Sequence, residues 1–219
     1  MINVTKTFLP PQEEYNNIVK RAWDKIWLTN RGELTLDLES KLKDYLNVDN
    51  IIITNNGTIP LQIALKLLGN NQEIITTPFS YVATSAAIVW ENCKPVFVDI
   101  ESSTKGINIQ QVHEAITPKT KAIMLAHALG NPFNLSIVMA IAKKYNLWVV
   151  EDDCDSLGAT YEGKKTGTFG DLATLSFYPA HHITMGEGGA VLVNNASLKK
   201  ITESFRDWGR DCWCPPGKD

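Results

Sequence analysis

The chain has 219 residues, of which 44% are hydrophobic, and this is enough apolar material to bury a substantial core. A formal net charge of -3 and a sequence pI near 5.8 give no basic surface for nucleic acid or for an anionic membrane. No apolar run approaches the roughly 20 residues that a membrane-spanning helix needs, and the first residues lack the layout of a signal peptide. We therefore expect a cytoplasmic protein that acts on small molecules, with no nucleic-acid or membrane partner.

The first predicted elements are helical. Residues 8–46 show a helical pattern that is interrupted by a turn at residues 29–32. Beyond residue 50, short β-rich runs alternate with amphipathic helical patterns such as residues 61–68 and 136–145. The seven predicted strands are residues 51–54, 73–77, 95–99, 121–126, 147–150, 173–177 and 190–193.

The alternation of strands and helices predicts the fold class. It favours an α/β fold with a mostly parallel seven-stranded sheet flanked by helices. The last two runs, 173–177 and 190–193, are joined by a loop without a helix. We therefore expect one of these two strands to run antiparallel, as edge strands often do.

Two segments lie where strands of such a sheet end. Residues 55–58 follow a strand and precede a helix, so their backbone N–H groups could hold a phosphate, with Ser176 adding a hydroxyl. The alternative is an ordinary turn with Thr58 as the helix N-cap. Residues 151–155 place several carboxylates after a strand, where one of them could pair with a ring nitrogen. An acidic surface loop and a magnesium site are the alternatives, and the spacing alone does not separate them.

The histidines and cysteines suggest further sites. His181 and His182 are adjacent, and on an extended segment they would point to opposite faces, which disfavours a shared metal. Residues 186–189 predict a tight turn, and as a phosphate loop they lack the ending of a P-loop. Four cysteines are too few for a disulfide framework in a chain of this size, so free thiols or metal ligands are expected.

These pieces, in this order, resemble the DegT-type family of sugar aminotransferases, which are fold-type I pyridoxal-phosphate enzymes. The resemblance runs over essentially the whole chain. Its motifs are Phe8-Leu-Pro-Pro, Trp27-Leu-Thr-Asn30, Asn56-Gly-Thr58, residues 77–84, Val96-Phe-Val-Asp99, His127 with Gly130-Asn-Pro132, Glu151-Asp152, Gly170-Asp171 and Gly186-Glu-Gly-Gly189. It implies the large domain of that fold, with the C-terminal small domain absent.

The resemblance also implies roles for single residues. Gly57, Thr58 and Ser176 match the phosphate-binding positions, Tyr81 matches the aromatic residue that stacks on the pyridine ring, and Asp152 matches the partner of the ring nitrogen. His181 stands where the family carries its cofactor-binding lysine. A lysine amine forms a Schiff base with an aldehyde, whereas an imidazole can only take or give a proton. His181 therefore implies a different reaction class.

The second half resembles one subgroup more closely, the CDP-4-keto-6-deoxyglucose 3-dehydrases of lipopolysaccharide biosynthesis. Residues 121–217 carry this likeness, including Tyr178-Pro-Ala-His-His and Ser204-Phe-Arg-Asp-Trp-Gly-Arg-Asp-Cys. The likeness implies noncovalent pyridoxamine phosphate, a histidine base, and C3 deoxygenation of a nucleotide-linked 4-keto-6-deoxyhexose for 3,6-dideoxysugars of the O-antigen. It also implies a homodimer and an NADH-dependent iron-sulfur flavoprotein reductase as partner.

The subgroup has a two-iron two-sulfur motif with which three cysteines agree. Cys154 and Cys212 are separated by 57 residues, and Cys214 follows with one residue between. The resemblance implies that these three are ligands of a 2Fe-2S cluster, whose fourth ligand would fall at position 222. Such clusters are normally held by four protein ligands. Cys93 fits no ligand position and is expected to be a buried core thiol.

The sequence also predicts a division of the chain into three segments and leaves three alternative functions open. We expect an N-terminal helical segment at 1–45, a cofactor-binding large domain at 46–205 and the start of a truncated cluster-binding loop at 206–219. One alternative is a GDP-4-keto-6-deoxymannose 3-dehydratase, which has the histidine but no cluster. A pyridoxal-phosphate-dependent nucleotide-sugar aminotransferase is the second, which His181 argues against. The third is an inactive truncated homologue, and the fragment alone is expected to be inactive.

Overall fold

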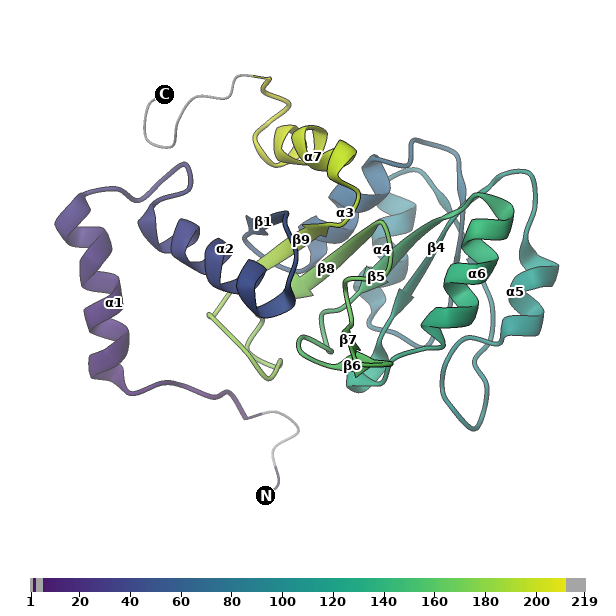
Figure 1. The fold of residues 1–219 in the computed structure, drawn as a ribbon, viewed down its shortest axis with the longest axis horizontal. Coiled ribbons are helices and arrows are strands. Elements are labelled where there is room, and N and C mark those ends of the chain that lie inside the picture. The colour runs from purple at the N-terminus through teal and green to yellow at the C-terminus, as the bar shows by residue number, and fades with distance from the viewer. Residues whose placement is uncertain (1, 3–5, 212–219) are drawn as a thin grey trace.

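The computed structural model describes residue 2 and residues 6–211, and these form an α/β fold around one seven-stranded sheet (Figure 1). The sheet confirms all seven predicted strands with small shifts at their ends. They are β1 (Ile51–Thr54), β2 (Glu73–Thr76), β3 (Lys94–Phe97), β4 (Thr120–Ala126), β5 (Trp148–Asp152), β8 (Leu172–Ser176) and β9 (Gly189–Val193). A short hairpin, β6 (Thr160–Tyr161) and β7 (Lys164–Lys165), lies outside this sheet.

The strand order is β1-β9-β8-β5-β4-β2-β3. Strand β9 runs antiparallel to both of its neighbours, β1 and β8, and the other neighbouring pairs are parallel. This confirms the prediction that one of the last two strands is antiparallel. The physical reason is the connection between β8 and β9, which contains no helix to carry the chain back across the sheet.

The described part of the chain contains seven α-helices, of which α1 lies against α2 and away from the sheet. They are α1 (Gln12–Lys25), α2 (Glu33–Leu46), α3 (Thr58–Lys66), α4 (Val82–Trp90), α5 (Ile109–Ala115), α6 (Leu135–Tyr145) and α7 (Lys199–Arg206). The predicted turn at 29–32 separates α1 from α2, whereas α4, α5 and α7 were not predicted. Among the residues that the structure describes, no helix is long and apolar enough to cross a membrane.

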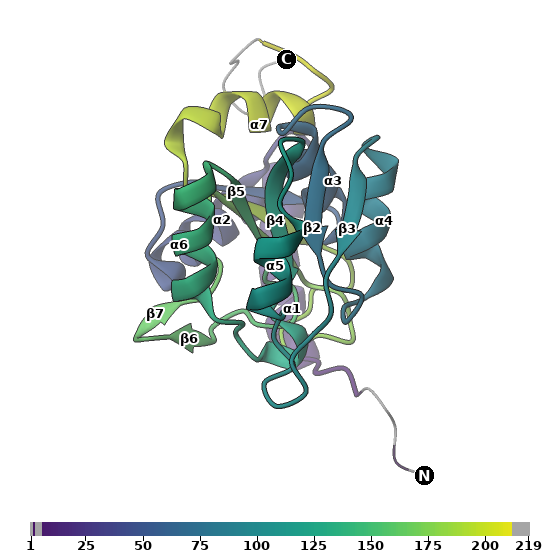
Figure 2. The same cartoon turned by 90° about the vertical axis from the view of Figure 1, so that its right-hand side faces the viewer.

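The core has two layers, because alternate strand residues face opposite sides of the sheet. Ile74, Met124 and Val150 pack toward α3 and α4. Ile75, Ile123 and Val149 pack on the other side, toward α5 and α6. Helix α2 covers that second side over β1, β8 and β9. Figure 2 shows α5 and α6 next to each other, on the side that faces the viewer.

One edge of the sheet collects the chain segments that carry the predicted site. Strands β1, β2, β4, β5 and β8 share one direction, so their carboxyl ends meet at that edge. The connection from β8 to the antiparallel β9, residues 177–188, begins and ends at the same edge. Open α/β sheets place their ligand sites at this position.

Candidate active site

A cavity of about 930 Å³ opens at the carboxyl edge of the sheet. All six residues to which the sequence assigns a cofactor or catalytic role line it: Gly57, Thr58, Tyr81, Asp152, Ser176 and His181. They come from four different strand ends, so their proximity depends on the sheet topology. The structure thus brings the predicted residues together, and their individual roles stay predictions.

Asp152 ends β5 and is only 6% exposed. Its Oδ2 accepts a hydrogen bond of 2.8 Å from the Thr84 hydroxyl, and its Oδ1 accepts one of 3.3 Å from the backbone N–H of Cys154. These two donors fix the plane of the carboxylate. Thr84, in the first turn of α4, is a site residue that sequence reasoning missed, because nothing in its local pattern shows its distant partner.

Gly57 packs closely against Ser176 in the wall of the cavity. A Cβ atom at position 57 would lie 2.6 Å from the Ser176 Cβ and 2.9 Å from its Oγ, so only glycine fits there. Helix α3 begins at the next residue, and the Ser176 hydroxyl accepts from the backbone N–H of Tyr178 at 3.3 Å. The backbone of Gly57 therefore packs directly against the Ser176 side chain and keeps the Ser176 hydroxyl next to the start of α3.

The start of α3 differs from the predicted N-cap at Thr58, and it limits how a phosphate could bind there. Thr58 does not cap the helix, because Gly57 occupies the N-cap position. Instead, the Asn56 Oδ1 accepts hydrogen bonds from the backbone N–H groups of Thr58, at 3.0 Å, and Ile59, at 2.9 Å. These two donors are therefore already satisfied. A phosphate at this end would have to displace the Asn56 amide or bind through the hydroxyls of Thr58 and Ser176.

His181 is held by a carboxylate. Its Nδ1 lies 3.1 Å from Asp155 Oδ1, and the side chains of His181 and Asp155 are 18% and 45% exposed. The hydrogen bond from His181 lowers the pKa of Asp155 below its ordinary value, although partial burial opposes the shift. With Nδ1 bound to Asp155, Nε2 is the ring nitrogen left for chemistry. Asp155 had no assigned role in the sequence, where it was one of several carboxylates after a strand.

The neighbouring histidine has another partner. The Nε2 of His182 lies 2.8 Å from the carbonyl oxygen of Leu157. Residues 181–183 form a bend, so the extended backbone assumed for the two histidines was wrong. His181 and His182 thus have separate partners, Asp155 and Leu157.

Tyr81 lies at the rim of the cavity, directly before α4. Its side chain is 79% exposed, which leaves a whole aromatic face available to a planar ligand. No described contact holds this ring against the cavity floor. Stacking on a pyridine ring therefore stays a prediction for Tyr81.

The cysteines give no support for a metal cluster in the described part of the chain. Cys154 lines the cavity, with its Sγ 3.9 Å from the Thr174 hydroxyl. Burial, together with the charge of Asp152, raises the pKa of this thiol well above its usual value. Cys212 and Cys214 lie outside the described residues. Within residues 6–211, no group of three or more His, Cys, Asp or Glu side chains could hold a metal ion, so the magnesium alternative gains no support either.

Cys93 occupies the position predicted for a core thiol. It packs in the apolar cluster beneath α3 and α4, and its thiol donates to the carbonyl oxygen of Gly69 at 3.3 Å. Burial raises the pKa of Cys93 above its ordinary value. The thiol is therefore a structural group, as expected.

The buried carboxyl of Asp153, the residue after Asp152, should make the free energy of unfolding depend on pH. Complete burial raises its pKa from 3.8 to about 6, while the hydrogen bond from Ser156 opposes the shift. A carboxyl with a raised native pKa stabilises the fold in its protonated form, and this contribution is lost as the pH rises through about 6. We expect Asp153→Asn to gain roughly 1 to 2 kcal/mol relative to the wild type between pH 5 and pH 8. Urea unfolding of both proteins at both pH values measures the free energies of unfolding. Free energies of the variant and the wild type that change equally between the two pH values would contradict the prediction.

Comparison with known proteins identifies the family. The family model described as "DegT/DnrJ/EryC1/StrS aminotransferase family" matches residues 11–214. The chain is 48% identical over 203 residues to the lipopolysaccharide biosynthesis protein RfbH of Salmonella typhimurium, covering 88% of this chain and 46% of RfbH. It is 44% identical over 191 residues to the dTDP-4-dehydro-2,6-dideoxy-D-glucose 3-dehydratase of Saccharopolyspora spinosa, covering 83% of this chain and 41% of that protein.

A solved structure shares the fold. The GDP-4-keto-6-deoxymannose-3-dehydratase with a trapped PLP-glutamate geminal diamine aligns with a TM-score of 0.87 and 26% identity, over 95% of this chain and 55% of that one. The chain thus spans about half the length of the relatives it matches. The match to the family model extends over nearly all of the sequence, and the sheet carries the predicted motifs at its carboxyl edge. The chain belongs to the DegT/DnrJ/EryC1/StrS aminotransferase family.

Proposed function

We propose that this chain carries the cofactor half of a pyridoxamine-phosphate-dependent dehydrase that removes the C3 hydroxyl of a nucleotide-linked 4-keto-6-deoxyhexose. One observation carries the proposal. His181, held by Asp155, lines the cavity at the position where the sequence resemblance places the family's lysine. An imidazole there supplies a base that cannot compete for the aldehyde form of the cofactor.

The residues of the cavity fit a phosphate-bearing pyridine. The hydroxyl-bearing residues Thr58 and Ser176 line the cavity beside the start of α3 and would hold the phosphate group. Asp152 lies across the same cavity with its carboxylate fixed by Thr84, as a partner of the ring nitrogen must be. When bound, the cofactor supplies an amine for the substrate ketone and a ring that withdraws electrons from the reacting carbons.

The chain's own residues then perform three tasks. Asp152 keeps a proton on the ring nitrogen, because a carboxylate next to that atom favours its charged form. His181 Nε2 would take a proton from the cofactor methylene and so supply the base that loss of the C3 hydroxyl requires. Asp155 accepts a hydrogen bond from His181 Nδ1 and so keeps the lone pair on Nε2.

The named relatives support this class of reaction. One is a lipopolysaccharide biosynthesis protein and two are sugar 3-dehydratases, of which one was solved with a PLP-glutamate adduct. Their substrates are linked to different nucleotides, dTDP and GDP, so we propose a nucleotide-linked hexose without choosing the nucleotide. A homodimer and an electron-donating NADH-dependent iron-sulfur flavoprotein reductase are the partners that we propose with it. The three predicted segments, 1–45, 46–205 and 206–219, also stay proposals.

Two other activities compete with this proposal. An aminotransferase fits the family description, but the chain lacks a lysine at position 181 to carry the amino group exchange. A GDP-4-keto-6-deoxymannose 3-dehydratase would share the histidine and lack the cluster. The spacing of Cys154, Cys212 and Cys214 argues for a 2Fe-2S cluster and against this second alternative. That choice depends on sequence spacing alone.

The products formed from nucleotide-linked sugars distinguish a dehydrase from an aminotransferase. A full-length protein that contains this chain is loaded with pyridoxamine phosphate and incubated with CDP-, GDP- and dTDP-linked 4-keto-6-deoxyhexoses in the presence of glutamate, with and without NADH and the reductase. Mass spectrometry follows the sugar. We expect the C3 hydroxyl to leave as water and, when NADH and the reductase supply two electrons, a hydrogen to replace it at C3. A 4-amino sugar formed at the expense of glutamate would identify an aminotransferase and contradict the proposal.

Iron and sulfide reconstitution adds a second readout to the same experiment. A cluster would give visible absorption that Cys154→Ser lowers and the matched buried-thiol variant Cys93→Ser does not. A featureless spectrum together with C3 dehydration would select the cluster-free dehydratase.

A further inference from the structure

Behind Asp152, on the other side of the sheet, lies a group of completely buried polar side chains. His127 follows β4 and Glu151 is the penultimate residue of β5, and both are 0% exposed. Their positions alternate with Ala126 and Asp152, so the two side chains point to the side of α6, away from the cavity. We call His127 and Glu151 the rear pair.

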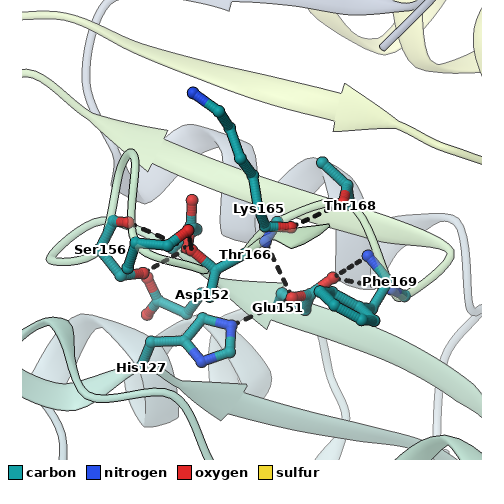
Figure 3. Close-up of polar contacts among 12 residues, drawn as sticks. His127, Glu151, Asp152, Ser156, Lys165, Thr166, Thr168 and Phe169 are labelled. Atoms are coloured by element: carbon teal, nitrogen blue, oxygen red, sulfur yellow. Dashed lines mark hydrogen bonds and ion pairs between the residues drawn. The ribbon is translucent and has the colours of Figure 1, made fainter. Parts of the chain in front are cut away.

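The carboxylate of the rear pair has every acceptor site filled (Figure 3). Glu151 Oε1 accepts from the backbone N–H groups of Phe169 and Gly170, each at 2.7 Å. Glu151 Oε2 accepts from the N–H of Gly167 at 2.8 Å and lies 3.0 Å from His127 Nε2. The rear pair therefore ties the end of β4 and the loop at 167–170 to β5.

The imidazole of the rear pair is fixed in plane and in tautomer. It stacks on Phe133, with ring centroids 4.3 Å apart and planes 7° from parallel. Its Nδ1 is buried with no hydrogen-bond partner among the described residues. A proton on Nε2, donated to Glu151, leaves only a lone pair unpaired, which costs less than an unpaired N–H group.

The rear pair contacts the backbone of Asp152 directly. The N–H of His127 donates to the carbonyl oxygen of Asp152 at 3.1 Å, and Glu151 precedes Asp152 in the chain. On the other flank, the N–H of Asp153 donates to the carbonyl oxygen of Thr174 at 3.0 Å. Asp152 is therefore held from behind by its backbone and from the front by Thr84.

Stability alone does not explain a buried pair of this kind. Desolvating ionisable groups costs several kcal/mol, and apolar residues of similar volume usually stabilise a fold equally well or better. Leu125 and Val149, two residues earlier in the same strands, fill this layer with apolar side chains. We propose that His127 and Glu151 are positioning residues, whose hydrogen bond holds the end of β5 so that the Asp152 carboxylate meets the cofactor ring nitrogen. This rests on the proposed cofactor role of Asp152.

Matched variants test the pair. His127→Leu removes the donor to Glu151, and His127→Gln keeps an amide donor at a similar distance from the backbone. Glu73→Gln is the control, because Glu73 is a strand carboxylate near the opposite edge of the sheet, bound to Lys94 and Thr117. If His127→Leu does not fold, His127→Asn replaces it, since the shorter amide does not reach Glu151.

The first readout needs no cofactor. Amide hydrogen exchange is measured at Cys154, whose N–H donates to Asp152 Oδ1, and at Phe169. We expect at least tenfold faster exchange at both amides in His127→Leu, rescue in His127→Gln, and wild-type exchange in Glu73→Gln. Wild-type exchange at Cys154 in His127→Leu would overturn the proposal.

The second readout is the ring nitrogen of bound ¹⁵N-labelled pyridoxamine phosphate, observed by NMR across a pH range. We expect His127→Leu to lose the ring proton at lower pH and to bind the cofactor about tenfold more weakly, with both restored in His127→Gln. An unchanged titration in His127→Leu would overturn the link to the cofactor. Faster exchange at Cys154 in a protein whose wild type binds no cofactor would instead uphold the positioning of Asp152 and refute the proposed function.

Discussion

Replacing His181 with lysine is expected to make the protein capture pyridoxal phosphate covalently. The new amine would enter the cavity that Gly57, Asp152 and Ser176 line, where the cofactor aldehyde is expected. Borohydride reduction should then fix one cofactor per chain at position 181, whereas the wild type should retain none. Peptide mass spectrometry after reduction measures the label. In the full-length protein, dehydration should fall by roughly 10² to 10⁴, the usual contribution of a general base.

His182→Lys is the matched control for this experiment. His182 is the next residue, but its ring binds the carbonyl oxygen of Leu157, and it does not line the cavity. Labelling should therefore be confined to the variant at position 181. Equal labelling of both variants would mean that a lysine anywhere on this loop reacts, and the assignment of the site would fail. No labelling at position 181 would contradict the cofactor assignment itself.

Gly57→Ala is expected to weaken cofactor binding by about 100-fold or more. The added methyl group would lie 2.6 Å from the Ser176 Cβ and 3.2 Å from the Cys154 Sγ, so it would push away Ser176, whose hydroxyl is proposed to hold the phosphate. Losing the contacts of a charged phosphate costs several kcal/mol, because each charge-assisted hydrogen bond contributes about 1.5 to 3 kcal/mol. Titration with pyridoxamine phosphate, followed by the cofactor's absorption, measures the affinity.

The control for this prediction is Gly106→Ala. Its added Cβ would have no neighbour closer than 3.4 Å, and Gly106 does not line the cofactor cavity. Overpacking at position 57 should also lower the free energy of unfolding by about 1 to 3 kcal/mol, so thermal unfolding is measured in parallel. Wild-type affinity in a folded Gly57→Ala protein would place the phosphate elsewhere.

The positions of the strands, and the edge of the sheet that carries the site, can be predicted from the sequence for physical reasons. Runs such as 51–54 and 147–150 are mostly apolar and rich in Ile or Val because both faces of their sheet are covered. The sequence therefore shows them as strands before their neighbours in the sheet are known. Parallel strands then carry the residues that follow them to one edge. For this reason Gly57, Asp152 and Ser176 could be placed in one site before any contact was known.

The missed features depend on contacts between distant residues. Thr84 and Asp155 acquire their roles only through Asp152 and His181, to which no local pattern points. Helix α4 is apolar at most positions, so it lacks the polar face that makes a helix recognisable. The side chain that caps α3 comes from Asn56, two residues before Thr58, the expected N-cap, and a single sequence does not distinguish these two capping arrangements.

The alternation along β5 makes the chemistry of this site sensitive to the length of one short strand. Glu151 and Asp152 are neighbours, but the Glu151 side chain is buried on the side of the sheet that α6 covers, whereas the Asp152 side chain lines the cavity. A single residue inserted or deleted within 148–150 would exchange these two directions and turn the buried glutamate toward the cofactor. Insertions in the surface turn at 162–163, by contrast, leave this parity unchanged. Related chains can therefore differ freely in loop length, while the number of residues in β5 must stay fixed for Asp152 to keep its task.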